Sequence, residues 1–287
     1  MGAMDARVLL ATFCLMPEGE PGGSLLVDAL AERGVEAAWA TWDDPAVDWA
    51  GADLVAVRST WDYQRRLPAW RDWVRRVEAS TGLLNGGEVF DWNTDKAYLE
   101  TLGEHVPVVP SELVDDEDLV GGLGRALGRW GSVVVKPRIG AGGVGVVVVD
   151  SVEDDRLVGL TPGPWLAQPL VESVRTRGET SVVLLDGVAH TQVDKVPGAG
   201  EVRVHTEHGG RSTLVEVDPE AERLALDAVR AAEALLEQRL DYARVDMMEL
   251  DGRLAVSELE LIEPGLYLDL APGSAAPFAD LVVDRLG

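Results

Sequence analysis

The chain has 287 residues, of which 46% are hydrophobic, so it can bury a substantial core and hold two or three small domains. Its formal net charge of -25 repels nucleic acid and anionic membranes, so neither is expected as a partner. No run approaches the roughly 18 to 20 apolar residues of a membrane span. An anionic ligand must therefore be held by a local group of Lys, Arg and backbone N–H groups, together with a divalent cation.

The start of the chain lacks a basic stretch followed by a long apolar one, so we expect a cytoplasmic protein with a cloning remnant before Asp5. The single cysteine, Cys14, excludes an internal disulfide and a cysteine-rich zinc site. We expect Cys14 to be a small buried residue at the end of the first strand.

The first hundred residues alternate segments typical of strands and of helices. Apolar runs typical of buried strands occupy residues 7–13, 35–40 and 54–57. Helical spacing marks residues 24–33, with Ser24 as N-cap, residues 67–79, and residues 93–102, with Asn93 as N-cap. This alternation predicts a parallel sheet whose ligand side lies at the carboxyl ends of its strands. The segment from Arg58 to Tyr63 follows such an end, so we expect it to face a cleft.

The rest of the chain is richer in β-branched runs. We expect helices over residues 115–130 and 218–239, and strands over residues 132–137, 145–150, 165–171, 180–185, 188–193, 242–250 and 253–262. The Asp251-Gly252 pair is a strong signal for a two-residue hairpin between the last two strands.

A glycine-rich segment lies between two valine-rich strands. Glycines at 140, 142, 143 and 145 allow backbone N–H groups to approach phosphate oxygens, and Lys136 adds a positive charge on the same side. A P-loop or a dinucleotide fingerprint would lead into a helix, whereas here a strand follows. Taken alone, the segment fits a phosphate clamp and an ordinary glycine-rich hairpin equally well.

The two C-terminal strands carry a second charged group. Positions two apart share one face of a strand, so Arg244 points with Asp246, and Glu258 points with Glu260. Carboxylate oxygens suit a hard cation, and a guanidinium suits phosphate, so the pair of strands indicates a magnesium–triphosphate site. The alternative is a solvated acidic face on an edge strand.

Taken in order, several motifs resemble those of the ATP-grasp superfamily, from about residue 85 to the C-terminus. They are Lys96, Val135-Lys-Pro137 with its glycine hairpin, Gln168-Pro-Leu-Val171, Gly178-Glu179, Arg244-Val-Asp246 and Glu258-Leu-Glu-Leu-Ile-Glu-Pro-Gly265. Within the superfamily, the chain most resembles the branch of the cycloserine-forming O-ureido-serine cyclo-ligases and the glutathione-synthetase-like proteins.

The resemblance implies an α/β fold, in part α+β, with three units. These are an N-terminal parallel α/β domain over residues 5–92, a small antiparallel lid subdomain over residues 93–170, and a C-terminal antiparallel sheet with helices over residues 171–287. The ATP cleft lies between the last two. Homodimerisation is a further expectation from the family.

The resemblance also implies roles for individual residues. Lys96 and Lys136 would bind ATP phosphates, and the loop from Gly140 through Ala141, Gly142 and Gly143 to Gly145 would close over them. Gln168, Pro169, Leu170 and Val171 would edge the adenine, and Glu179 would contact the ribose.

On the metal side, Arg244 would contact the transferred phosphoryl group, while Asp246 and Glu260 would hold one or two Mg²⁺ ions. The usual pattern places Asn two residues after the glutamate, but this chain has Ile262, which cannot coordinate. Glu263 or Glu258 would then supply the missing oxygen.

Other residues leave alternatives open. Lys195 is as consistent with a surface lysine as with a catalytic contact to phosphate or the acyl oxygen. Arg203 and His205 alternate on an expected strand and fit a substrate carboxylate site or a solvated loop equally well. Arg58, Trp61, Asp62 and Arg203 are the hypothesised contacts to an amino-acid-like substrate.

The function that follows is a ligase that uses ATP and Mg²⁺ to activate a small-molecule carboxylate as an acylphosphate, which an amine then attacks. Both groups can belong to one molecule, as in the ring closure that forms cycloserine in antibiotic biosynthesis, or to two. The alternatives are a small-molecule kinase and a nucleotide-binding protein without turnover.

Overall fold

The computed structural model of the chain describes residues 6–160 and 163–287. The expected cloning remnant before Asp5, and the first residue of the expected N-terminal domain, lie outside the described residues. Within the described residues, no helix combines the length and the apolar character that crossing a membrane would require.

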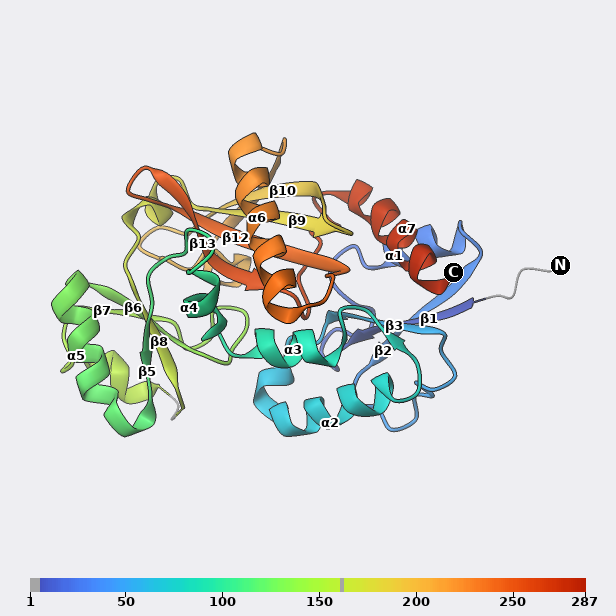
Figure 1. The fold of residues 1–287 in the computed structure, drawn as a ribbon, viewed down its shortest axis with the longest axis horizontal. Coiled ribbons are helices and arrows are strands. Elements are labelled where there is room, and N and C mark those ends of the chain that lie inside the picture. The colour runs from blue at the N-terminus through green and yellow to red at the C-terminus, as the bar shows by residue number, and fades with distance from the viewer. Residues whose placement is uncertain (1–5, 161–162) are drawn as a thin grey trace.

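The predicted parallel sheet near the N-terminus is confirmed (Figure 1). Its strands are β1 (Ala6–Thr12), β2 (Val35–Thr41), β3 (Leu54–Ser59) and the short β4 (Gly82–Leu83), in the order β2-β1-β3-β4. All three strand pairs are parallel. Helices α1 (Ser24–Ala31) and α2 (Leu67–Glu78) pack on opposite faces, so both faces are covered, as a parallel sheet requires.

Two expectations for single residues of this domain are wrong. Cys14 is exposed, because the chain leaves the sheet after Thr12 and turns before Cys14. Ser24 is the first residue of α1 rather than its cap, since Gly23 takes the cap position and no side chain bonds to the free N–H groups there.

The helix expected over residues 93–102 is in fact two helices, α3 (Gly86–Thr94) and α4 (Tyr98–Leu102). Asn93 therefore lies in the last turn of α3 and caps nothing. Its buried amide instead donates to the carbonyl of Leu259 (2.7 Å) and accepts from the N–H of Leu261 (2.9 Å). The Asn93 side chain does not cap a helix because these bonds to the backbone around the end of β13 occupy its amide.

A small antiparallel sheet follows, in the order β5-β8-β6-β7. It comprises β5 (Glu112–Val114), β6 (Val133–Pro137), β7 (Val147–Val149) and β8 (Trp165–Pro169), and α5 (Leu119–Trp130) packs on it. The predicted hairpin between β6 and β7 is confirmed, with Val135 opposite Val147. The glycine-rich segment is the loop of this hairpin.

The third sheet is antiparallel, in the order β11-β10-β9-β12-β13. Its strands are β9 (Glu179–Leu185), β10 (Val188–Val196), β11 (Arg211–Val215), β12 (Tyr242–Leu250) and β13 (Arg253–Glu260), and α6 (Pro219–Leu236) covers one face. The strand expected around Arg203 and His205 is wrong, because residues 201–205 are irregular and a short 3-10 turn follows.

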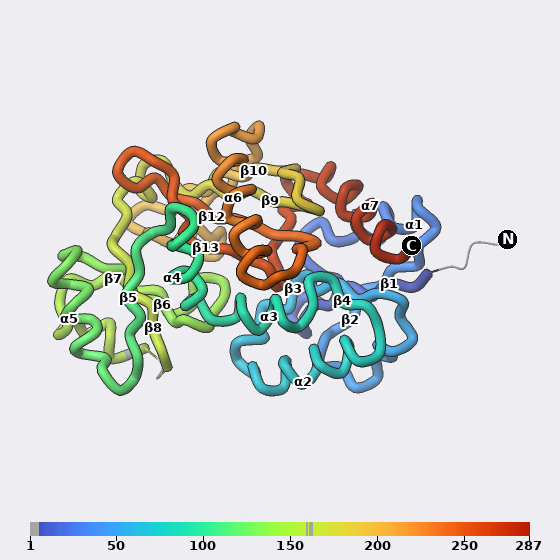
Figure 2. The backbone as a smooth tube through the Cα atoms, viewed as in Figure 1, coloured from blue at the N-terminus to red at the C-terminus, as the bar shows by residue number. Residues whose placement is uncertain are grey.

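The C-terminal helix α7 (Ala275–Leu286) returns to the first domain and packs against α1. Figure 2 shows this return, with the red end of the chain beside the blue start. Val183 and Leu185 of β9 share a core cluster with β1, α1 and α7. The first and third sheets are therefore joined through a common apolar core, and the small sheet extends from them on the other side (Figure 1).

Candidate active site

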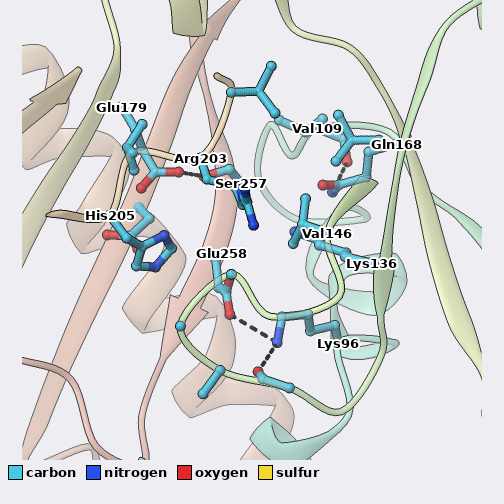
Figure 3. Close-up of a pocket in the computed structure, with 18 of the residues that line it drawn as sticks. Lys96, Val109, Lys136, Val146, Gln168, Glu179, Arg203, His205, Ser257 and Glu258 are labelled. Carbon is cyan, nitrogen blue, oxygen red and sulfur yellow. Dashed lines mark hydrogen bonds and ion pairs between the residues drawn. The ribbon is translucent and has the colours of Figure 1, made fainter. Parts of the chain in front are cut away.

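A pocket lies between the small sheet and the third sheet, with about 1230 Å³ of space when its open mouth is included. Strands β6 and β8 and the glycine loop form one wall, and strands β12 and β13 form the other. The irregular residues 202–205 close one side. In Figure 3, labelled side chains from β6, β8, β13 and residues 203–205 point into the same space.

Most residues expected at the nucleotide and metal sites line this pocket. They are Lys96, Lys136, Gly140, Ala141, Gly142, Gly143, Gln168, Pro169, Leu170, Val171, Glu179, Asp246, Glu258, Glu260 and Glu263. Lys195 and Arg244 lie behind the lining and bond to carboxylates that belong to it. Gly145 lies outside the lining, where the loop returns to β7 against Pro137.

Lys96, Lys136 and Lys195 are the only lysines in the sequence. Lys96 donates from Nζ to the carbonyl of Gly140 (2.7 Å) and pairs with Glu258 (3.1 Å), so it ties the glycine loop to β13 (Figure 3). Lys136 has no hydrogen bond or ion pair within the described residues. Burial lowers the pKa of Lys136, although Glu258 opposes the shift. A half-buried ammonium that lacks an anionic partner among the described residues is a ready site for an anion.

The pairing of β12 with β13 brings the carboxylates together. Arg244 lies opposite Glu260, and Asp246 lies opposite Glu258. Arg244 donates to both oxygens of Asp246 (3.0 and 2.9 Å) and also bonds to Glu260. Burial raises the pKa of Glu260 to about 7, although Arg244 opposes the shift. The expected edge-strand alternative fails, because these groups face the pocket and are largely buried.

The outer edge of β13 is also closed. Residues 107–109 pair with it through hydrogen bonds to both backbone groups of Val256. Tyr98 bonds through its hydroxyl to both the N–H and the carbonyl of Leu259. With Asn93 beyond it, the edge backbone is satisfied by protein rather than by water.

Lys195 lies on β10 and is buried beneath the pocket floor. It pairs with Glu179 and with Asp246 (3.4 Å), so it is not a surface lysine. Burial alone would lower the pKa of Lys195, but Asp246 and Glu179 raise it above its usual range. Ser257 donates to the other oxygen of Glu179 (3.3 Å), which fixes that carboxylate between three elements.

Glu263 lies beyond the end of β13 and differs from the other carboxyl groups of the pocket. Its carboxyl group has no hydrogen bond or ion pair within the described residues. Burial raises the pKa of Glu263 well above its usual range, with Glu260 adding to the shift. Tyr63, a pocket residue that sequence reasoning did not single out for a role, likewise has no partner for its hydroxyl among the described residues.

Ile262 does not face the pocket at all. Its side chain is buried in the aromatic core of the first domain, in the cluster that contains Trp70 and Phe90. The carboxylates Asp246, Glu258 and Glu260 are each neutralised by Arg244, Lys195 or Lys96. Within the described residues, no group of three His, Cys, Asp or Glu side chains is arranged to hold a metal ion as it stands.

The other end of the pocket is apolar. Val109 and Val171 belong to one core cluster, against which Met248 packs. Gln168 donates from its side chain to Ser111 (3.1 Å) and more weakly to the carbonyl of Val109 (3.4 Å). An apolar slot with the Gln168 amide at its edge suits a heteroaromatic ring.

The expected substrate contacts in the first domain lie elsewhere. Arg58 is fully buried, pairs with Glu20 (3.0 Å) and donates to the carbonyl of Pro264. Asp62 accepts from Trp42 (2.8 Å) and Arg66 (3.0 Å). Trp61 donates to the backbone carbonyl of Glu263 (3.1 Å). None of the three lines the pocket, and of this segment only Tyr63 does.

Arg203 and His205 both line the pocket, although not from a strand. Arg203 pairs with Glu201, and His205 Nδ1 is buried without a partner. A Cβ added to Gly143 would lie 3.1 Å from His205 Nδ1, so the tip of the glycine loop touches this segment. Burial lowers the pKa of His205 to about 4, so the imidazole is neutral near pH 7.

Comparison with known proteins gives consistent results. The family described as "D-cycloserine synthetase DcsG, N-terminal domain" matches residues 8–85. The cycloserine biosynthesis protein DcsG of Streptomyces lavendulae is 31% identical over 278 residues, which cover 91% of this chain and 92% of that protein. The chain belongs to the DcsG branch of the ATP-grasp ligases. It is therefore an enzyme, and the resemblance found in its motifs is confirmed.

Solved structures support the same fold. The crystal structure of D-cycloserine synthetase DcsG superposes with a TM-score of 0.88 at 27% identity, covering 98% of this chain and 100% of that one. The ATP-grasp ligase PsnB, complexed with a minimal precursor, Mg and ADP, superposes with a TM-score of 0.65 at 18% identity, covering 100% and 99%. The expected ATP-grasp fold is confirmed, and the pocket of this ligase lies between its two antiparallel sheets.

Proposed function

We propose that this ligase uses ATP and Mg²⁺ to convert a carboxylate of an amino-acid-like substrate into an acylphosphate, which an amine nitrogen then attacks to form a C–N bond. The observation that carries the proposal is the distribution of charge in one pocket. Lysines and the glycine loop lie on one wall, and an arginine among three carboxylates lies on the other.

The nucleotide fits this distribution of groups. The apolar slot beside Gln168 would take the adenine, and Glu179 would lie near the ribose. Lys136 would contact the phosphates, because it is the lysine of the pocket lining that has no anionic partner among the described residues. Lys96 would hold the loop of residues 140–145 over them through its bond to the Gly140 carbonyl.

For the metal, we propose Asp246, Glu258 and Glu260 as the ligands, because Asp246 lies opposite Glu258, Glu260 follows on the same strand, and all three line the pocket with oxygen donors. Magnesium, when bound, neutralises charge on the phosphates and orients them. Glu260 stands two residues after Glu258 and would act where the family pattern has asparagine. The set of three metal ligands would then be complete without residue 262, where this chain has isoleucine.

The residues of the chain would act on the reacting atoms in two ways. Arg244 would stabilise the phosphoryl group as it passes to the substrate carboxylate, because its guanidinium is already fixed by Asp246. Lys195, beneath the pocket floor, would keep Glu179 and Asp246 ionised through its ion pairs with both carboxylates. The lining of the pocket would exclude water, which would otherwise hydrolyse the acylphosphate.

Ring closure within one molecule is our preferred form of the reaction, since the relative that covers 91% of the chain is named for cycloserine biosynthesis. The experiment is mass spectrometry of products from ATP, Mg²⁺ and a panel of amino-acid-derived carboxylates that includes O-ureido-serine. We expect ADP, phosphate and a product that has lost the free carboxylate, and no turnover when Mg²⁺ is chelated.

Other outcomes of this experiment would identify the alternatives. A stable phosphorylated product would show a small-molecule kinase instead. ATP binding without ADP release in every mixture would show a nucleotide-binding protein without turnover.

A further inference from the structure

The carboxyl groups of the pocket differ in how they are neutralised. Glu179 pairs with Lys195, Glu258 pairs with Lys96, and Glu260 pairs with Arg244. Asp246 pairs with both Arg244 and Lys195. Within the described residues, Glu263 is the carboxyl group of the pocket lining that lacks any cationic partner. An uncompensated carboxylate is costly to bury, so burial favours the neutral acid in the ligand-free protein, and a positive charge from a ligand, which the described residues do not supply, would stabilise the carboxylate form.

Glu263 is also held in a fixed position. The indole of Trp61 donates to its backbone carbonyl (3.1 Å), and Arg58 donates to the next carbonyl, that of Pro264. Arg58 itself is fully buried and paired with Glu20. The backbone that carries the Glu263 side chain is therefore held by two side chains of the first domain.

The location of Glu263 points to the substrate rather than to the nucleotide. The apolar slot of Val109, Val171 and Met248 marks one end of the pocket. Glu263 follows Glu260 on the chain and adjoins the first domain, whose Tyr63 lines the pocket there with an unpartnered hydroxyl. Glu263 and Tyr63 both line the pocket, and Trp61, two residues before Tyr63, donates to the backbone carbonyl of Glu263.

We propose that Glu263, with the Tyr63 hydroxyl beside it, binds the ammonium group of the acid substrate. The substrate class is then an α-amino acid derivative whose carboxylate lies toward Arg244 and Glu260. This assigns Glu263 to substrate recognition in place of the metal role expected for it. The assignment rests on the proposed ligase function, because the ammonium belongs to the acid that is activated.

The test compares two ligands that differ in the ammonium alone, O-ureido-serine and its desamino counterpart 3-(ureidooxy)propanoate. Titration calorimetry with Mg²⁺ and a non-hydrolysable ATP analogue measures both affinities in the wild type and in Glu263→Gln. We expect the wild type to bind the amino form about thirtyfold more tightly or better. In Glu263→Gln the two affinities should agree within about twofold.

Matched variants separate recognition from a structural effect. Glu258→Gln alters a carboxyl group already paired with Lys96, so it should keep the preference for the amino form even if nucleotide binding weakens. Tyr63→Phe should reduce the preference without abolishing it. Thermal unfolding of each variant reports whether the fold is intact.

Several results would overturn the proposal. They are equal binding of both ligands to the wild type, no binding of either ligand, and a preference that survives in Glu263→Gln. A loss of Mg²⁺ affinity in Glu263→Gln with the ligand preference unchanged would return Glu263 to the metal site. If the preference holds but no carboxylate yields ADP, the ligase function fails while the ammonium site stands. If the desamino acid turns over as fast as the amino acid, the ligase function stands and the ammonium site fails.

Discussion

Lys136 and Glu263 are the lysine and the carboxyl group of the pocket lining that lack an ion pair within the described residues. The other carboxyl groups of the lining pair with Lys96, Lys195 or Arg244, and Arg203 pairs with Glu201. ATP would bring phosphate oxygens to Lys136, and the acid substrate would bring an ammonium group to Glu263. The pocket is thus incomplete in its charges until both substrates are present.

Replacement of Lys136 by Met should weaken ATP binding about ten- to hundredfold, because a charge-assisted bond to phosphate is lost. The same change should raise the thermal stability of the ligand-free protein, since it removes a half-buried charge that lacks a partner among the described residues. Lys136→Arg, which keeps the charge, should restore part of the affinity. Calorimetric titration and thermal unfolding measure the two effects, and an unchanged ATP affinity would contradict the assignment.

The three lysines offer a chemical test of the site. Lys96 and Lys195 are engaged in ion pairs, whereas burial lowers the pKa of Lys136 and so increases its neutral, nucleophilic fraction. An amine-directed acylating reagent should therefore modify Lys136 first among the side chains, and ATP with Mg²⁺ should protect it. Peptide mass spectrometry at short reaction times measures this, with the terminal amine as internal control. Equal labelling with and without ATP would argue against a nucleotide at Lys136.

Two elements that are distant in sequence, the glycine loop and residues 201–205, meet over the pocket. Gly142 and Gly143 both have positive φ, at 63° and 67°, but only Gly143 touches a neighbour. A side chain at Gly142 would enter open space, whereas one at Gly143 would press on the His205 ring and Arg203. Substitutions at the two glycines therefore distinguish the effect of backbone strain from the effect of the contact with residues 203–205.

Gly142→Ala and Gly143→Ala should each carry about 1 kcal/mol of backbone strain in the closed loop. Gly143→Ala should in addition hold the loop away from residues 203–205 and raise KM for ATP several-fold beyond that of Gly142→Ala. Steady-state kinetics on the two variants measure the difference. Matching KM values would mean that the contact with His205 does not contribute to closure.

At the scale of the whole molecule, a buried ion pair joins the first domain to the turn that carries Glu263. Arg58 comes from the end of β3 and Glu20 from the loop after β1, and the Glu20 carboxylate also accepts from the N–H of Leu266 (2.8 Å). Both side chains are almost fully buried, and Arg58 stacks on Phe278 and Tyr242. The pair therefore connects the two ends of the chain beneath the pocket.

Breaking this pair should destabilise the protein more than it alters nucleotide binding. Arg58→Met leaves the buried Glu20 carboxylate without its cationic partner and should lower the free energy of unfolding by about 3 to 5 kcal/mol. Urea denaturation measures the loss. The double variant Arg58→Met with Glu20→Gln should recover part of it, and a full loss in the double variant would show that packing, rather than charge, is at stake. The sequence predicts a direct substrate contact for Arg58, whereas the structure buries its side chain against Glu20.

The sequence by itself determined the parallel first sheet, the glycine hairpin and the positions of Lys96, Lys136, Arg244 and Asp246. These depend on local period, turn chemistry and motif order, which are properties of short segments. It did not determine that β13 is sealed by Asn93 and residues 107–109, or that Arg58 is buried, because these depend on contacts between segments far apart in the chain.

Only the tertiary structure decided which charges are paired. Glu258, Glu260 and Glu263 look equivalent in the sequence, yet the register of β12 against β13 supplies Arg244 to Glu260, and the packing of Lys96 supplies a cation to Glu258. Glu263 receives none from the described residues. The physical reason is that the sequence specifies which side chains are ionisable, whereas the ion pairs that neutralise them depend on the neighbours that folding brings close.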